Sequence, residues 1–83
     1  MRACPCCEYL TLEADEAGSD DICPVCFWED DFVQFQDPTY AGGANHASLE
    51  QARRNFREFG ASEKRRMPHV RPAKPSEIPA SPN

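Results

Sequence analysis

Cys4-Pro5-Cys6-Cys7 is matched further along the chain by Cys23-Pro24-Val25-Cys26, and both stretches have the form C-P-x-C. Fifteen residues separate Cys7 from Cys23, so the whole reads C-x2-C-x15-C-x2-C, a spacing within the range of zinc sites. A C-x-x-C turn places two sulfurs on one side of a tight loop, and two such turns supply the four corners of a tetrahedron. The spacing therefore predicts one structural Zn²⁺, with four ligands: Cys4, Cys7, Cys23 and Cys26.

Other uses of paired cysteines fit the sequence less well. A redox C-x-x-C of the thioredoxin kind needs a βαβ context, and none surrounds either turn. Met1-Arg2 leads straight into Cys-Pro without the apolar stretch of a signal peptide, so we expect a cytoplasmic protein with reduced thiols rather than disulfides. No apolar run approaches 18 residues, so we expect no membrane partner. An iron–sulfur cluster also uses four thiolates and ranks below zinc.

Cys6 is the fifth cysteine, and the pairing of the two turns places it opposite Val25. By that comparison it is a small packed thiol and not a ligand. The alternative is that Cys6 is reactive, or replaces Cys4 or Cys7 in the ligand set. His46 and His69 are also potential ligands, although a four-cysteine set needs neither.

The chain of 83 residues is long enough for one small domain, and a domain of this size is only marginally stable without a disulfide or a metal. Its charge is unevenly spread. Residues 1–46 carry ten acids and one base, a net charge of −9, whereas residues 47–83 carry a net charge of +4. The N-terminal half is thus a poor surface for a polyanion and a suitable one for a basic partner.

The sequence predicts a small α+β fold. Residues 9–12 are β-prone, residues 14–21 resemble a hairpin loop that brings the two cysteine turns together, and residues 32–35 are a candidate strand. Together they predict a zinc-ribbon-like N-terminal β-hairpin region. One zinc-stabilised domain is expected over residues 1–70, followed by a disordered Pro-rich tail over residues 71–83.

The main helix is predicted over residues 48–59, packed on the hairpin region. Ser48 can cap it with Gln51 three residues later, and Gly60 suits a left-handed C-cap. Its apolar residues recur at helical steps and share one face: Leu49, Ala52, Phe56 and Phe59. A second helical turn is expected from Ser62 to Met67, where Pro68 stops it.

Two further stretches suggest chemistry but have simpler interpretations. Trp28-Glu29-Asp30-Asp31 is a carboxylate cluster, but acidic runs are usually solvated, and no set of nucleophile, base and orienting group accompanies it, so we expect no enzyme. Gly42-Gly43-Ala44-Asn45 lacks the Lys-Ser/Thr of a phosphate-binding loop. We interpret it as a tight connector in which Asn45 hydrogen-bonds a backbone group.

A basic stretch runs along the predicted helix and beyond it. On a helix Arg53 and Arg57 share a face, which could contact phosphates. The alternative is that these bases lie against the acidic N-terminal half or are solvated. No aromatic stacking platform accompanies them, which favours this alternative. The stretch comprises Arg53, Arg54, Arg57, Lys64, Arg65 and Arg66.

The combination of motifs resembles the bacterial cysteine-rich CPCC family over roughly residues 3–71. The residues that carry the resemblance include the two cysteine turns, Trp28-Glu29-Asp30-Asp31, Gly42-Gly43-Ala44-Asn45 and Phe59-Gly60-Ala61. Glu8 departs from the pattern, because a glycine is expected after the first cysteine turn. The resemblance implies a small bacterial protein without assigned catalytic residues. Some members of the family look like neighbours of secreted polymorphic toxins, which implies an immunity role.

Three functions follow as hypotheses. The first is a zinc-stabilised protein-interaction module that binds a protein partner with a basic surface, such as a toxin domain. The second is a nucleic-acid-binding zinc ribbon that uses the Arg/Lys-rich helix. The third is a small enzyme in which zinc or Cys6 takes part in chemistry.

Overall fold

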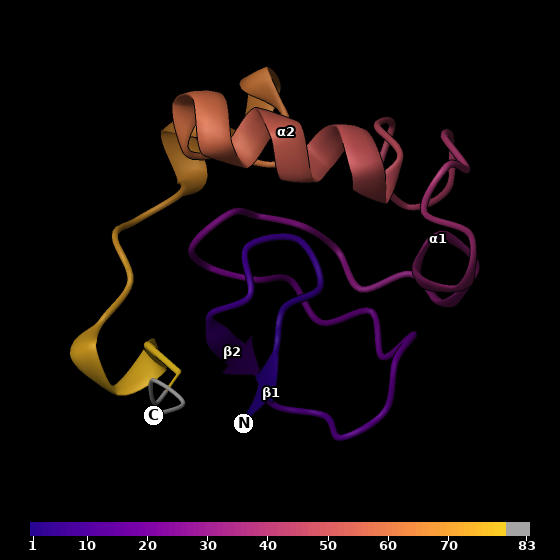
Figure 1. The fold of residues 1–83 in the computed structure, drawn as a ribbon. Coiled ribbons are helices and arrows are strands. Elements are labelled where there is room, and N and C mark those ends of the chain that lie inside the picture. The colour runs from indigo at the N-terminus through magenta and orange to yellow at the C-terminus, as the bar shows by residue number, and fades with distance from the viewer. Residues whose placement is uncertain (80–83) are drawn as a thin grey trace.

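The computed structural model describes residues 1–79 and combines two short strands with short helices (Figure 1). The elements follow in the order β1 (Arg2–Ala3), β2 (Leu10–Leu12), α1 (Phe32–Gln36), α2 (Leu49–Phe59), and the 3-10 helices η1 (Lys64–His69) and η2 (Pro75–Glu77). Within residues 1–79, none of the helices has the length and apolarity that crossing a membrane requires.

The strand pairing differs from the predicted hairpin between the two cysteine turns. β1 and β2 are antiparallel and enclose the first turn, with Arg2 opposite Leu12. The second turn is closed by its own bridge between Ile22 and Glu29. Residues 14–21 connect the two without forming strands. Part of the reason is that the amides of Gly18 and Ser19 donate to the carboxylate of Asp30 instead of to a neighbouring strand.

The predicted strand over residues 32–35 is wrong, because this stretch forms α1. Asp31 precedes the helix in an extended conformation, and its carboxylate accepts a hydrogen bond from the Gln34 amide at 3.0 Å. That N-cap satisfies one of the free amides at the helix start. Local capping thus favours a helix over the strand that the short apolar run indicated.

The main helix is as predicted. The Ser48 hydroxyl accepts from the Gln51 amide at 3.1 Å, and Gly60 ends α2 with φ of 83°. Leu49 and Ala52 are fully buried on the inner face. In Figure 1, α2 lies across one side of the N-terminal loops. It closes a core against which Cys7 packs and which is formed by Cys4, Cys6, Leu12, Cys23, Val25, Cys26, Trp28, Leu49 and Ala52.

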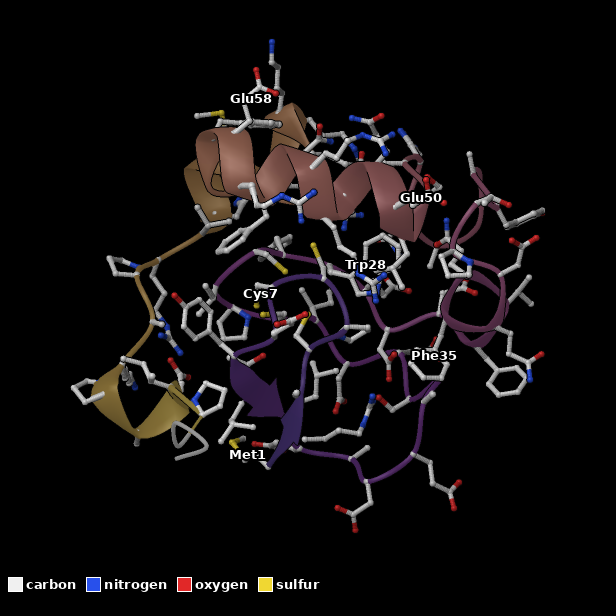
Figure 2. The ribbon with its side chains drawn as sticks, in the orientation of Figure 1. Met1, Cys7, Trp28, Phe35, Glu50 and Glu58 are labelled. Carbon is white, nitrogen blue, oxygen red and sulfur yellow. The ribbon has the colours of Figure 1, made fainter. Side chains whose placement is uncertain are left out.

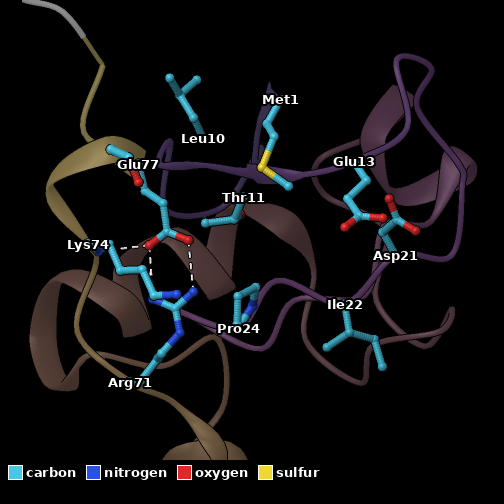
Figure 3. Close-up of a pocket in the computed structure, with 11 residues that line it drawn as sticks. Met1, Leu10, Thr11, Glu13, Asp21, Ile22, Pro24, Arg71, Lys74 and Glu77 are labelled. Atoms are coloured by element: carbon cyan, nitrogen blue, oxygen red, sulfur yellow. Dashed lines mark hydrogen bonds and ion pairs between the residues drawn. The ribbon is translucent and has the colours of Figure 1, made fainter.

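The chain beyond α2 is more ordered than predicted. The helical turn expected over residues 62–67 forms as η1, but it begins at Lys64 and continues to His69, so the expectation that Pro68 stops it is wrong. The expectation of a disordered tail from residue 71 is not met over residues 71–79, where η2 forms and contacts β2. Arg71 donates two hydrogen bonds to the Glu77 carboxylate, at 2.9 and 2.7 Å (Figure 3). The remainder of the predicted tail, residues 80–83, lies outside the described residues.

Candidate metal centre

The two cysteine turns have the same backbone geometry. In the first, the Cys4 amide donates to the Tyr9 carbonyl at 2.9 Å and the Glu8 amide donates to the Cys4 carbonyl at 2.8 Å. The second turn repeats both bonds. There the Cys23 amide donates to the Trp28 carbonyl at 3.0 Å, and the Phe27 amide to the Cys23 carbonyl at 2.7 Å.

A left-handed residue closes each turn. Glu8 has φ of 70° and Phe27 has φ of 66°, a conformation that favours glycine. Glu8 thus stands where a glycine is expected, and its backbone adopts the left-handed conformation that a glycine would adopt there.

The structure brings together the four cysteines predicted as ligands. Each offers a sulfur, and the four sulfurs lie within 4.8 Å of one another. The distance from Cys4 Sγ to Cys26 Sγ is 3.6 Å, as is that from Cys7 Sγ to Cys23 Sγ. Figure 2 shows Cys7 in the interior, below α2. These distances exceed a disulfide bond, which is about 2.05 Å.

Two of the sulfur–sulfur distances match those expected around a single tetrahedral metal ion. Zn–S bonds of about 2.3 Å at tetrahedral angles imply S···S edges of about 3.8 Å. The two 3.6 Å distances are close to that value. Cys4, Cys23 and Cys26 are fully buried and Cys7 is half-buried, so water has little access to the centre. The four cysteines therefore form a possible metal site with no evident open position.

Hydrogen bonds distribute charge unequally over the four thiols. The thiols of Cys26, Cys4 and Cys7 lower the pKa of Cys23, and the Thr11 hydroxyl, 3.0 Å from its sulfur, lowers it further. Hydrogen bonding to Cys23 raises the pKa of Cys4, Cys7 and Cys26. One thiolate is thus already favoured on Cys23, and the Thr11 hydroxyl is a contact that the sequence pattern did not predict.

Cys6 and the two histidines lie outside the four-sulfur cluster. Cys6 is 5% exposed and belongs to the core, in agreement with the interpretation of a packed thiol. The His69 ring stacks on Phe27 with 5.2 Å between the ring centroids. His46 is exposed and lies 3.9 Å from a Glu63 carboxylate oxygen.

Arginines from the second half of the chain hold both turns. Arg53 on α2 donates to the Pro5 carbonyl inside the first turn at 2.9 Å. Arg66 on η1 donates to the Phe27 carbonyl at the end of the second turn, and to Asn45 Oδ1 at 2.7 Å. Part of the predicted basic stretch is therefore used inside the molecule.

The acidic run and the glycine-rich connector are structural. Asp30 is fully buried and accepts from Arg2, so the prediction of a solvated face is wrong at this position. Asp31 caps α1 and also accepts from the Ala44 amide at 2.9 Å, and these hydrogen bonds lower its pKa. Asn45 binds the Glu29 backbone through both ends of its side-chain amide, as the connector interpretation predicted.

A cleft of about 760 Å³ lies between the β1–β2 hairpin and η2 (Figure 3). Its ionisable lining residues are Glu13, Asp21, Lys74 and the paired Arg71 and Glu77. No thiol or imidazole belongs to this lining among the described residues.

Comparison with known proteins identifies the family. A family model described as "Cysteine-rich CPCC" matches residues 2–77, nearly the whole chain and all four clustered cysteines. No curated protein matches the chain. The match extends past residue 71 to η2, so the segment expected to be a tail is largely part of the family domain. The chain belongs to the cysteine-rich CPCC family.

Proposed function

We propose that this protein is a zinc-stabilised protein-interaction module whose acidic N-terminal half binds a protein partner with a basic surface. The observation that carries the metal assignment is the gathering of four sulfurs within 4.8 Å. A set of four sulfur ligands at tetrahedral distances is typical of zinc or an iron–sulfur cluster, and a single ion fits this spacing.

A structural role for zinc agrees with how little regular structure surrounds the site. β1 has two residues and β2 has three, and the four sulfurs occupy the centre of the core. Such small folds depend on a metal because binding and folding are coupled. Four cysteine ligands leave no open coordination position, so we assign the ion to architecture and not to catalysis.

The charge distribution supports the choice of partner. Residues 3–52 contain no lysine or arginine, whereas the first half carries ten acids. A partner with a positive surface would associate faster and more selectively with such a face. An inhibitor of a basic toxin domain, as expected for an immunity protein, is one function of this class.

The alternative is a nucleic-acid-binding zinc ribbon. Exposed bases on and after α2, such as Arg57 and Lys64, favour it. Against it, Arg53 and Arg66 bind the cysteine turns, and Arg54 and Arg65 lie within 4 Å of Glu50 and Glu63. Few arginine and lysine side chains of the basic stretch therefore remain available to contact the phosphates of a nucleic acid.

One experiment separates the two functions. The zinc-loaded chain is immobilised and exposed to extract from its native source, with and without nuclease, and bound protein is eluted with a salt gradient. We expect a basic protein that is retained in stoichiometric amount after nuclease treatment. Fluorescence anisotropy with labelled DNA and RNA is the second arm. Tight nucleic-acid binding that falls steeply with salt, with no retained protein, would contradict the proposal.

A further inference from the structure

α1 is an amphipathic helix whose apolar side faces solvent. Phe32 is 51% exposed, Val33 is 55% exposed and Phe35 is 42% exposed, whereas Gln34 is fully buried. At about 100° per residue, the three apolar side chains fall on one side of the helix, opposite Gln34. Figure 2 shows Phe35 on α1, well apart from Cys7 and the core.

This orientation is held by hydrogen bonds and is not an accident of a loose segment. Gln34 Nε2 donates to the carbonyls of Tyr40, Asn45 and Ala47 at 3.0 to 3.1 Å. Gln34 Oε1 accepts from the Asn45 amide at 3.1 Å and from Asn45 Nδ2 at 2.9 Å. Turning the apolar side of α1 inward would leave these buried groups without partners, which is costly.

The exposed apolar side chains lie beside acidic residues. Gly18 of the loop over residues 14–21 abuts Phe32, since a Cβ at that glycine would lie 2.6 Å from Phe32 Cβ. This loop contains four acids and no base, and Asp37 directly follows α1. We call the three exposed apolar residues of α1 the α1 surface: Phe32, Val33 and Phe35.

We propose that the α1 surface docks a segment of a protein partner in which apolar side chains are flanked by lysine or arginine. Exposed apolar clusters rimmed by polar residues mark interaction sites. Here the exposed charges of the rim are acidic, since Arg2, which hydrogen-bonds to the loop over residues 14–21, is paired with the buried Asp30. Two copies of this chain would bring like charges together, which disfavours self-association through this surface. The inference rests on the proposed function and specifies where the basic partner binds.

The test uses a phage-displayed library of random dodecapeptides selected on the zinc-loaded chain. Selected peptides are synthesised, and their affinities are measured by fluorescence polarisation at low and high salt. We expect sequences that combine Lys or Arg with large apolar residues, and affinities that fall with salt. The double variant Phe32→Ser/Phe35→Ser should lose at least about tenfold in affinity, because central aromatic residues dominate such contacts.

The matched control is Met67→Ser/Ile78→Ser, which removes two exposed apolar side chains elsewhere, 46% and 55% exposed. Its affinity should stay within about twofold of the parent, as is usual for residues outside a contact. Metal content and the ¹H–¹⁵N spectrum of each variant confirm the fold. Val33→Ser is a milder second variant, and chemical-shift changes caused by the peptides should centre on residues 14–21 and 32–40.

The outcomes distinguish this inference from the proposed function. If basic peptides bind the double variant as tightly as the parent, the α1 surface is not the docking site, but the proposal of a basic partner stands. If the selected peptides carry no positive charge, the proposal of a basic partner is wrong. A selection that enriches no peptide would overturn docking of a linear segment. A dimer of the parent chain in sedimentation equilibrium, lost in the double variant, would assign the surface to a second copy instead.

Discussion

At the scale of single residues, the cysteine turns depend on two side chains in an unusual backbone conformation. Glu8 and Phe27 occupy equivalent positions, and both have positive φ. The left-handed region costs a residue with a Cβ about 1–2 kcal/mol. Phe27 offsets that cost by stacking with His69, and its carbonyl accepts a hydrogen bond from Arg66. Glu8 is exposed and has no comparable contact in the described part of the chain.

Glu8→Gly should therefore stabilise the protein. Relief of the strained φ outweighs the extra entropy of glycine in the unfolded chain, and we expect a gain of up to about 1 kcal/mol in the free energy of unfolding. Urea unfolding at a fixed zinc concentration measures it. Glu8→Ala is the control, because alanine removes the carboxylate but retains the Cβ. An equal gain in both variants would show that charge, not backbone strain, is responsible.

The protonation of the four clustered thiols predicts that zinc binding releases protons. The pKa of Cys23 is lowered, whereas those of Cys4, Cys7 and Cys26 are raised, so at least these last three thiols hold a proton at neutral pH. Zinc binding requires four thiolates and must displace these protons, so affinity falls as pH falls. We expect the release of at least about three protons per ion. Calorimetry in buffers of different ionisation enthalpy measures this number, and a release of one or none would contradict the assignment.

At the scale of elements, α2 and η1 act as a clamp on the cysteine turns. Arg53 and Arg66 reach across the chain to the carbonyls of Pro5 and Phe27. Arg66 is only 8% exposed, and burial lowers its pKa although Glu63 opposes the change. The helix is thus attached to the cysteine turns by polar bonds as well as by its apolar face.

Arg66→Met keeps most of the side-chain packing but removes both donors. The Phe27 carbonyl and Asn45 Oδ1 each lose one of their hydrogen bonds, so we expect a loss of about 2 kcal/mol in the free energy of unfolding. The measurement is urea unfolding of the zinc-loaded protein. Arg57→Met, at an exposed site on α2, should change stability by less than about 0.5 kcal/mol. Similar losses in both variants would argue against the clamp.

The elements that could be predicted are those with local determinants. α2 carries its own cap at Ser48 and its own stop at Gly60, and both function as the sequence indicated. The strand predicted in place of α1 rested on the short apolar run over residues 32–35, which is compatible with either conformation. The Gln34 side chain points inward because it donates hydrogen bonds to the carbonyls of residues 40, 45 and 47. These partners lie further along the chain, and the local sequence pattern does not reveal them.

The four-cysteine cluster was predictable to a similar degree. The doubled C-P-x-C motif was enough to select the four clustered cysteines, because each turn is a local structure. The residues that support the site were not predictable in the same way. Arg53 and the Pro5 carbonyl are 48 positions apart, and the Thr11 hydroxyl reaches Cys23 from β2.

At the scale of the whole molecule, the segment after η1 completes the structure. The Arg71 amide donates to the Pro24 carbonyl of the second cysteine turn at 3.2 Å, and the Arg71 guanidinium lowers the pKa of Glu77 to about 2. The proline content that suggested disorder instead includes a proline at the first position of η2. Composition alone did not show the ion pair that turns this segment back onto the hairpin.

Glu77→Gln should loosen this segment without unfolding the domain. The neutral amide cannot form the paired contact with Arg71, so the amides of Glu77 and Ile78, which donate to Lys74 and Pro75, should open more often. We expect their hydrogen exchange to accelerate by about tenfold while that of α2 is unchanged. Glu58→Gln, exposed on α2, is the control. Unchanged exchange at residue 78 would show that the ion pair does not hold the segment.

The central claim is that one zinc ion organises the molecule through four thiolates. Elemental analysis and X-ray absorption of protein produced in reducing cells test it most directly, with Cys6→Ser and Cys23→Ser as the paired variants. We predict one zinc per chain with four sulfur neighbours at about 2.3 Å, preserved in Cys6→Ser and lost or weakened in Cys23→Ser. Absence of bound metal, or a zinc shell completed by nitrogen or oxygen in the parent chain, would contradict the claim.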